Sequence, residues 1–590
     1  AISTLNNRKG FLHMKKKLLP ALIVTGLIIL VVIIMGITAL INKYTPTKKT
    51  EDLKEYFNIS SDDEAALIVD NELSDYKAKI IDKKIYVDYK FVHDSLNSRF
   101  YWDANENVLL YTTASDIISA AADSNSYSVT KQTNDFGYPI VKATSDSALI
   151  ALDYVKQYSN ITFKSYDDPA RIVITSKWDE IDSATVSKST QVRVKGGIKS
   201  PILKEVKKDD KITILDSGDK WDKVATEDGV IGYIKRKALS ESKKTKLTNP
   251  DYEEETFTHI KKDKDICLAW NQVTSQSANS KVPQVISSTK GINVMSPTWF
   301  YLNDNNGNLA DIASKDYVSY CHSQGIEVWG LFSNFENTDV DAAYVLTHTS
   351  TRTTLINQIM SAAFNYELDG VNIDFENITE AAYGDSYIEF IRELAIKCHN
   401  NGISLSVDVT VPASFNKFFN RSDMANFADY IVIMGYDEHY KGSDAGSVSS
   451  IPWVTEGVES TLKEVPADQI ILGMPFYTRI WELTPKEDDD AVTDTEDQSK
   501  YTVASQVYSM DAAAAQLATN NATAALDEES GQNYAEWSVS NKLYKVWLED
   551  TTSLEKRLKL VDDNKLAGAA FWKLGFENSS VWDTVIKYLN

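Results

Sequence analysis

The sequence predicts a multidomain chain whose C-terminal region is a (β/α)8 TIM barrel with an α+β insertion between strands 7 and 8. The chain has 590 residues, about four times a usual domain length of roughly 150. Eight apolar, strand-like runs alternate with helical patterns in the C-terminal part, which is typical of parallel βα units. The composition changes several times before that part. There we expect one transmembrane helix, small α+β repeats and a small β barrel.

The composition is that of a folded, acidic protein. Hydrophobic residues make up 43% of the chain and charged residues 25%, as in ordinary globular domains. Lys+Arg 61 against Asp+Glu 84 gives a net charge of −23, so the chain lacks the basic surface that nucleic acids require. The three cysteines, Cys267, Cys321 and Cys398, form no CxxC pair. We therefore expect neither a nucleic-acid partner, nor a disulfide framework, nor a cysteine-rich zinc site.

Residues 18–41 carry no charged side chain and predict a transmembrane signal anchor. At about 1.5 Å per residue this run reaches about 36 Å, enough to cross a hydrocarbon core of roughly 30 Å. Lys15, Lys16 and Lys17 precede it, and the positive-inside rule places residues 1–17 in the cytoplasm. The remaining domains would then lie outside the cell, on a bacterial cell surface.

Two alternatives to this anchor exist. Ile37-Thr38-Ala39 is a poor match to a signal-peptide cleavage site, and a signal peptide has a shorter apolar region. A buried core helix is disfavoured because no polar face interrupts the run. Met14, just before the lysines, is a candidate start of the natural chain.

A polar linker, residues 42–61, leads to a region of short strands at 62–180. Strand-like runs around Leu67–Val69 and Ile85–Val87 are followed by a small helix and two more strands. A weaker version of the same order follows Ile140, so we interpret the region as tandem small α+β stalk repeats. They resemble the repeats at the N-terminus of copper amine oxidases and of bacterial wall proteins. That resemblance implies a spacer or attachment unit.

Residues 184–240 predict four or five short strands with glycine-containing turns, which fits a small β barrel. The stretch from Trp221 to Tyr233 resembles bacterial SH3-like domains. The resemblance implies that this domain binds cell-wall peptides, although its aromatic residues equally fit a small core. Residues 241–262 read as a linker.

The barrel is expected over residues 263–590. A (β/α)8 barrel needs about 250 residues, and the surplus lies between Trp481 and about Gly568. This insertion opens with an acidic stretch, residues 487–497, which we interpret as a solvated loop rather than a metal site. The eight predicted strands are Ile266–Ala269, Ile292–Met295, Val328–Phe332, Gly370–Phe375, Ile403–Val409, Tyr430–Met434, Ile470–Met474 and Ala569–Trp572.

The phrase Leu368-Asp-Gly-Val-Asn-Ile-Asp-Phe-Glu376 contains the candidate catalytic residues. Side chains alternate along a strand, so Asn372, Asp374 and Glu376 share one face and the apolar residues share the other. The apolar face must meet the helices, which turns the polar face into the barrel. Burying carboxyl groups about 6.6 Å apart on one face destabilises the folded state, so we expect them to have a function. A purely structural network is the alternative.

This phrase resembles glycoside hydrolase family 18, the chitinase-like enzymes, through the pattern Asp-Gly-x-x-x-Asp-x-Glu. Further matches are residues 434–437 (Met-Gly-Tyr-Asp), 473–477 (Gly-Met-Pro-Phe-Tyr) and 570–572 (Ala-Phe-Trp). One departure is Asn372, where many chitinases carry another aspartate. An amide cannot ionise, so proton sharing between this position and Asp374 is lost, and the pH profile is expected to differ.

The resemblance implies retaining cleavage of β-linked N-acetylhexosamine, assisted by the substrate itself. Glu376 would protonate the leaving oxygen, and burial together with the charge of Asp374 would raise its pKa. Asp374 would orient the substrate's acetamido group, and Tyr436 would hydrogen-bond it. No metal or organic cofactor is implied. The remaining residues expected to bind substrate are Asp369, Asn372, Met434, Asp437, Trp572, Trp299, Trp329 and Trp481. For Trp299, Trp329 and Trp481, which would stack on sugars, simple core packing is an equal alternative.

The order of domains suggests a surface enzyme that cleaves N-acetylglucosamine bonds in peptidoglycan. Residues 434–440 and 527–532 resemble the spore-cortex-lytic N-acetylglucosaminidase branch more than secreted chitinases. A chitinase, or an endo-β-N-acetylglucosaminidase acting on other glycans, is the alternative within the same fold. A catalytically silent, lectin-like wall-binding protein is the alternative of another class. The presence of Glu376 argues against it, because silent relatives usually lack the acid.

Overall fold

The computed structural model describes residues 3–486 and 497–589. Most of the predicted acidic loop, residues 487–496, lies outside the described residues. The chain forms two compact units, one made of residues 1–96 and 149–253, the other of residues 97–148 and 254–590. The second unit contains the predicted barrel.

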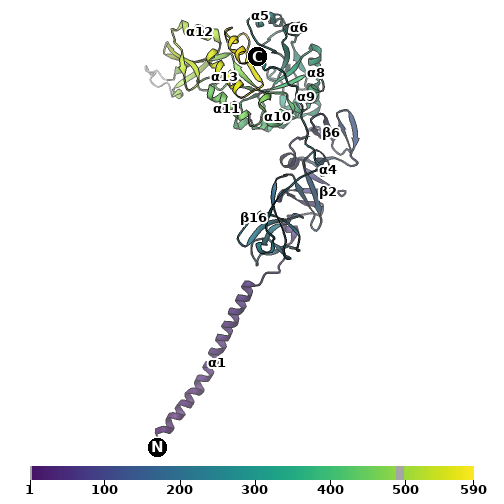
Figure 1. Cartoon of the computed structure of the whole chain (residues 1–590), viewed down its shortest axis with the longest axis vertical. Coiled ribbons are helices and arrows are strands. Elements are labelled where there is room, and N and C mark those ends of the chain that lie inside the picture. Colours follow the sequence, from purple (N-terminus) through teal and green to yellow (C-terminus); the bar gives the residue numbers. More distant parts are fainter. Residues whose placement is uncertain (1–2, 487–496, 590) are drawn as a thin grey trace. The chain divides into compact units, whose positions relative to one another are not determined.

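Helix α1 (Ser3–Tyr44) confirms the expectation of one apolar helix near the N-terminus (purple in Figure 1). Its segment Pro20–Tyr44 has a mean hydropathy of 2.9 and buries none of its surface in the protein. The helix is long and apolar enough to cross a membrane. A signal sequence would meet the same description.

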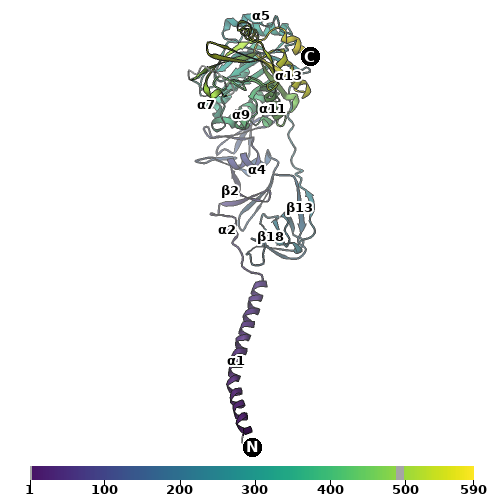
Figure 2. The same cartoon turned by 90° about the vertical axis from the view of Figure 1, so that its left-hand side faces the viewer.

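A seven-stranded sheet has the order β11-β12-β1-β2-β3-β10-β9, and all of it except β9 and the first residue of β10 belongs to the first unit (β2 and α4 are labelled in Figure 2). Strand β1, from the first predicted repeat, runs parallel to β12, from the second, and Ala66 lies beside Arg171. The two halves therefore form one sheet rather than two separate small domains. The elements are α2 (Leu53–Tyr56), β1 (Glu64–Val69), β2 (Glu72–Ile81), β3 (Lys84–Asp88), α3 (Tyr89–Phe91), β9 (Val141–Ala143), β10 (Ala148–Ala151), α4 (Leu152–Gln157), β11 (Thr162–Tyr166) and β12 (Arg171–Thr175).

A second seven-stranded sheet occupies the region of the predicted small barrel, with the order β15-β14-β18-β17-β16-β13-β19 (Figure 2). Its edge strand β19 lies in the segment predicted as a linker, so that boundary is corrected. Three of the four residues of this strand are lysines, and charged side chains on an edge strand discourage aggregation. The strands are β13 (Glu180–Thr185), β14 (Thr190–Arg193), β15 (Ile202–Val206), β16 (Lys211–Asp216), β17 (Trp221–Thr226), β18 (Ile231–Lys235) and β19 (Lys243–Lys246).

Residues 97–148, predicted as part of the stalk, instead belong to the barrel unit. They form a sheet of β4 (Phe100–Asp103), β5 (Val108–Thr112), β6 (Ile117–Ala121), β7 (Ser126–Val129) and β8 (Gln132–Asp135). This sheet, here called the docking sheet, contacts helix α9 (Glu380–His399) of the barrel (Figure 1). The Tyr101 hydroxyl lies 2.7 Å from Ser386 Oγ, and Thr112 donates to Glu389 Oε1 at 2.8 Å. The sequence predicted the strands β4 and β5, but neither β6 to β8 nor the surface that buries the sheet.

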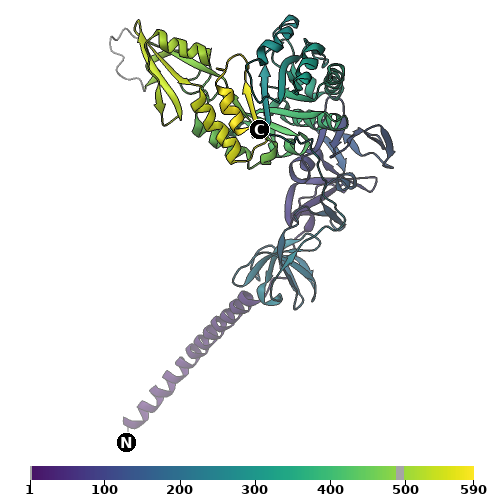
Figure 3. The same ribbon diagram turned by 45° about the horizontal axis from the view of Figure 1, so that its top comes forward.

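The eight predicted barrel strands are confirmed, and they close through the parallel pair β20 and β21. Figure 3 shows the barrel region and its insertion in teal to yellow. Apolar side chains such as Leu268, Val432 and Ile471 fill the barrel interior, while a larger core separates the strands from the surrounding helices. The strands are β20 (Ile266–Asn271), β21 (Val294–Leu302), β23 (Glu327–Ser333), β24 (Gly370–Asp374), β25 (Ser404–Thr410), β26 (Tyr430–Met434), β27 (Ile470–Pro475) and β33 (Gly568–Trp572), with β22 (Leu309–Asp311) added beside β21.

Helices follow the strands on the outside of the barrel, as expected for βα units. They are α5 (Val282–Ile286), α6 (Lys315–Ser323), α7 (Ala342–Thr347), α8 (Thr349–Tyr366), α9 (Glu380–His399), α10 (Arg421–Phe427), α11 (Ile451–Thr461), α13 (Thr551–Asp563) and α14 (Val581–Tyr588).

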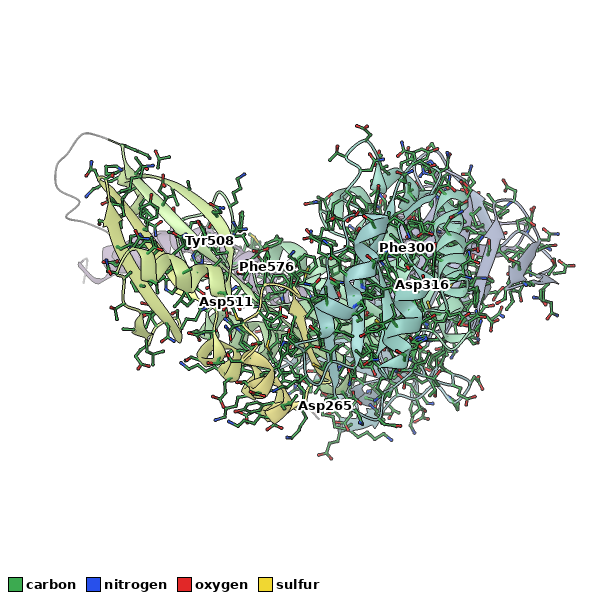
Figure 4. All side chains as sticks on the ribbon, turned by 90° about the horizontal axis from the view of Figure 1, so that it is seen from above. Asp265, Phe300, Asp316, Tyr508, Asp511 and Phe576 are labelled. Atoms are coloured by element: carbon green, nitrogen blue, oxygen red, sulfur yellow. The ribbon has the colours of Figure 1, made fainter. Side chains whose placement is uncertain are left out.

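The insertion between β27 and β33 is a five-stranded antiparallel sheet with one helix, seen as a separate lobe in Figure 4. Its helix meets the barrel where Met510 N–H donates to the carbonyl of Phe576, next to the last barrel strand. Where the chain returns from β32 to the barrel, Arg557 of α13 (Thr551–Asp563) forms a buried double hydrogen bond with Glu549. The elements are β28 (Tyr477–Pro485), β29 (Tyr501–Ser509), α12 (Met510–Thr519), β30 (Ala525–Asp527), β31 (Gln532–Val539) and β32 (Lys542–Leu548).

Replacing Tyr101 should destabilise the barrel itself, because its ring is buried and lies 5.0 Å from the buried Arg352 guanidinium. We expect Tyr101→Ala to lower the free energy of unfolding by about 3 kcal/mol. Tyr101→Phe, which loses only the hydroxyl bond, should cost about 1 kcal/mol. Denaturant unfolding followed by barrel tryptophan fluorescence measures both. An unchanged barrel transition in Tyr101→Ala would mean that the docking sheet and the barrel are independent.

Candidate active site

The side chains of strand β24 alternate between the two faces of the sheet, as the sequence predicts. Val371 and Ile373 are fully buried in the core between strands and helices. Asn372 contacts Trp270, which belongs to the core inside the barrel. Asp374 ends the strand on the same side as Asn372, and Glu376 follows in the loop. The acidic residues therefore collect at the carboxyl end of the strands, where barrel active sites form.

Asn372 is held by four hydrogen bonds that fix the orientation of its amide. Its Oδ1 accepts from Trp270 Nε1 at 3.0 Å and from Ser296 Oγ at 3.1 Å. Its Nδ2 donates to Ser406 Oγ at 3.0 Å and to Asp408 Oδ1 at 2.7 Å. Because two donors face Oδ1, the amide group must turn its N–H bonds toward Asp408. Asn372 has no exposed surface, so its contribution is to the network beneath the site, and direct contact with substrate is ruled out.

Asp374 is 7% exposed, and its Oδ1 has no hydrogen-bond partner among the described residues. Burial raises its pKa well above the usual range, and the nearby carboxyl groups of Asp408, Glu376 and Glu336 act in the same direction. A buried acceptor without a donor is costly in a folded protein. This oxygen is therefore available to a donor from outside the chain.

Glu376 is held through its backbone and leaves its side chain in contact with solvent. Asn334, just after β23, accepts from Glu376 N–H at 2.8 Å and donates to its carbonyl at 2.9 Å. Partial burial raises the pKa of the Glu376 carboxyl, and the charges of Asp437 and Glu336 raise it further. The sequence predicted a raised pKa but assigned the charge effect to Asp374.

Three residues at the end of β26 and just after it lie near the acidic residues. Met434 and Tyr436 are partly exposed, and Asp437 is exposed. Tyr477, on β28, donates its hydroxyl hydrogen to Asp437. Burial raises the pKa of Tyr436 well above its usual range, and Asp374 and Asp408 contribute, so its hydroxyl stays protonated and faces these acids.

Trp572, the last residue of β33, lies at the same end of the barrel. Its ring packs edge-on against Trp270 with centroids 5.9 Å apart, and Trp270 in turn contacts Tyr436. Trp572 remains partly exposed. It therefore offers an apolar surface beside the acidic residues.

Three other tryptophans predicted to stack on sugars are core residues instead. Trp299 is fully buried and donates to Asn279 at 2.7 Å, and Trp329 is fully buried against Tyr430. Trp481 is 1% exposed and donates to the backbone carbonyl of Gly446, in the loop that follows β26. None of these rings presents a face to a ligand, so the prediction is corrected for all three.

Asp369 is also corrected from a substrate-binding residue to a structural one. It precedes β24, about 16 Å of strand from Asp374 at about 3.3 Å per residue, and so lies toward the opposite end of the barrel. Its Oδ2 accepts from Val328 N–H at 2.8 Å and lies 2.7 Å from His322 Nε2. These bonds fasten the start of β24 to its neighbours.

Sequence reasoning missed several residues that the fold brings to the site: Asp408, Glu336, Asn334, Tyr477 and Trp270. Asp408 carried a visible signal, because Ser404, Ser406 and Asp408 alternate along a strand in the same way as the residues of β24. Glu336 and Asn334 follow the end of β23 closely. Within the described residues, no group of three or more His, Cys, Asp or Glu side chains has the geometry of a metal site.

Residues 332–577 match the model of the family Glycosyl hydrolases family 18. The match runs from the end of β23 to beyond β33 and includes β24 with its acidic residues. The chain therefore carries a family 18 glycosyl hydrolase domain and is a glycoside hydrolase.

Its curated relatives include a glycosylase and a cortical fragment-lytic enzyme. The uncharacterized glycosylase YvbX of Bacillus subtilis is 24% identical over 48% of this chain and 81% of its own length. The cortical fragment-lytic enzyme of the same organism is 24% identical over 47% of this chain and 63% of its own length. Among solved structures, the spore cortex-lytic enzyme SleL of Bacillus megaterium is 19% identical over 58% of this chain and 77% of its own, with a TM-score of 0.47.

Removing a neighbouring charge should lower the pKa of Glu376, because like charges disfavour its ionised form. We expect Asp437→Asn and Glu336→Gln each to lower it in a carboxyl NMR titration. Glu438→Gln is the matched control, since Glu438 is engaged with Ser450 and should leave the pKa of Glu376 in place. A Glu376 titration identical in all four proteins would contradict this electrostatic account.

Proposed function

We propose that the protein is a membrane-anchored extracellular enzyme that cleaves β-linked N-acetylglucosamine bonds in peptidoglycan with retention of configuration. The observation that carries this proposal is the buried, unpartnered Oδ1 of Asp374 next to the solvent-accessible carboxyl of Glu376. Asp374 Oδ1 can accept a hydrogen bond from a ligand. The carboxyl of Glu376, whose pKa is raised, carries a proton at the surface. An N-acetylated sugar supplies both an amide N–H and a glycosidic oxygen.

The first step needs a proton on the leaving oxygen and a nucleophile at the anomeric carbon. Glu376 gives the proton, which its raised pKa keeps in place toward neutral pH. The acetamido oxygen of the sugar forms the new bond to the anomeric carbon as the bond to the leaving oxygen breaks. Asp374 accepts the acetamido N–H and stabilises the positive charge that develops on it.

The second step returns the enzyme to its starting state. Glu376, now ionised, takes a proton from water as the water attacks the anomeric carbon and the acetamido oxygen departs. The Tyr436 hydroxyl, protonated because its pKa is raised, hydrogen-bonds the acetamido group. Trp572 provides the apolar surface under the sugar ring, with Met434 and Asp437 beside it.

Peptidoglycan is proposed as substrate because two relatives are named cortical fragment-lytic enzyme and sporulation-specific glycosylase. The matched segments cover 63% and 52% of those relatives, so the activity of the whole chain remains part of the proposal. A chitinase or an endoglycosidase acting on other glycans is the second candidate. Relatives named as chitinase-like proteins support it.

Localisation and the accessory domains belong to the same proposal. Helix α1 would anchor the chain, with residues 1–17 in the cytoplasm and the catalytic domain outside. The sheet of β13–β19 would act as an SH3-like domain that binds cell-wall peptides. The sheet of β1–β3 and β9–β12 would act as the spacer between membrane and wall. Alkaline carbonate extraction of expressing cells tests the anchor, since a spanning protein stays with the membrane and a cleaved one does not.

Glu376→Gln should lower kcat by about 10²–10⁴-fold on purified peptidoglycan, because it removes the general acid and leaves the fold intact. New reducing ends measure turnover, and mass spectrometry of the fragments names the sugar at each new end. N-acetylglucosamine at that end supports the proposal. Full turnover in Glu376→Gln would contradict it, and tight retention on unchanged glycan in the wild type would favour the lectin-like alternative.

A substrate without its acetamido carbonyl should not be cleaved, because the nucleophile belongs to the substrate. We expect at least a 10²-fold lower kcat/KM for a glucosaminide with a free 2-amino group than for the N-acetylated form. Hydrolysis of both at equal rates would point to an enzyme nucleophile instead.

A further inference from the structure

Asp408 is a buried acid on β25 to which the proposed reaction assigns no task. It follows Ser404 and Ser406 on the inward face of the strand and is 2% exposed. The parallel register that sets Ile373 beside Val407 puts Asp374 next to Asp408 one residue further on. Neighbouring strands lie about 4.8 Å apart. Two carboxyl groups therefore adjoin each other at the end of the barrel.

No described basic side chain forms an ion pair with either acid. Asp408 is faced by the Asn372 amide from β24, by Asp374, and by Glu376 from the loop beyond. The hydroxyls of Tyr436 and Tyr387 lie near both acids, and Tyr387 has no hydrogen-bond partner among the described residues. Two adjoining buried carboxylates without a cation cannot both stay ionised, so one of them keeps a proton.

The hydrogen bonds decide which acid is ionised first. Asn372 donates to Asp408 at 2.7 Å, and its amide cannot turn around because Trp270 and Ser296 both donate to its oxygen. Asp408 therefore has a fixed donor for a negative charge. Asp374 Oδ1 has no donor in residues 3–486 and 497–589.

We propose that Asp408 is a positioning residue that shares one proton with Asp374 and takes it during the reaction. In the resting enzyme Asp408 is ionised and Asp374 is protonated. When positive charge develops on the acetamido group, the O–H bond of Asp374 breaks and an O–H bond forms on Asp408, which leaves Asp374 as the carboxylate beside the cation. The proton returns when water completes the reaction. This inference rests on the proposed function.

The same arrangement explains how an asparagine can occupy position 372. The sequence predicted that proton sharing with Asp374 is lost there, because an amide does not titrate. The neighbouring strand supplies the missing acid, and Asn372 becomes the donor that keeps that acid ionised at rest.

The test compares the wild type with Asp408→Asn and with the exchange variant Asn372→Asp/Asp408→Asn, all in the full chain. Asp408→Asn should lower kcat by about 10–100-fold, the loss expected for one to two pK units of stabilisation. The exchange variant should regain at least tenfold of that loss, because it puts an acid back beside Asp374. Ser404→Ala, on the same strand face but deeper in the barrel, is the control and should keep wild-type kcat and pH profile.

A carboxyl NMR titration provides a readout that needs no turnover. In the wild type, one of the two carboxyl groups, Asp374 or Asp408, should stay protonated at pH values at which ordinary aspartates are ionised. In Asp408→Asn the pKa of Asp374 should fall, since a negative neighbour has been removed. An unchanged Asp374 titration, or a wild-type kcat and pH profile in Asp408→Asn, overturns the inference. A wild type that cleaves no glycan refutes the proposed function instead, while the titration still decides on the shared proton.

Discussion

Asp374 and Asp408 are buried on neighbouring strands, and neither forms an ion pair with a basic side chain in the described part of the chain. The arrangement of this end of the barrel depends on that constraint. Burial favours the neutral form of each acid, and each opposes the ionisation of the other. The chain supplies a fixed amide donor to Asp408 and none to Asp374 Oδ1. The resulting asymmetry leaves one oxygen ready for a ligand donor. Glu376 lies further out, where its proton can reach a substrate.

Much of the remaining fold keeps this arrangement in place. Asn334 fixes the backbone of Glu376 from β23, and Trp270 and Ser296 fix Asn372 from β20 and β21. On the outside, the docking sheet packs against α9, the helix that follows β24. A segment far from the barrel in sequence thus supports the element that carries the acids. Because of these contacts, residues 97–148 belong to the same compact unit as the barrel.

The sequence predicted the barrel strands well because each is a buried apolar run between turn signals, and β26 matches its prediction residue for residue. It also predicted Asp374, Glu376, Tyr436 and Trp572 at one end, since they follow strands that end there. It failed for Trp299, Trp329 and Trp481, because an aromatic side chain gives no signal of whether its ring meets core or solvent. It missed Asp408, whose importance depends on the register between β24 and β25 rather than on local pattern. The placement of β4 and β5 on the barrel is likewise a long-range contact.

A crystal of the Glu376→Gln protein soaked with a peptidoglycan-derived oligosaccharide would test whether the buried acid and the substrate's own amide act together. The account predicts the acetamido N–H within hydrogen-bond distance of Asp374, roughly 2.6–3.2 Å between heavy atoms, and the glycosidic oxygen beside the side chain at position 376. An acetamido group directed away from Asp374, or a sugar bound elsewhere on the barrel, would contradict it.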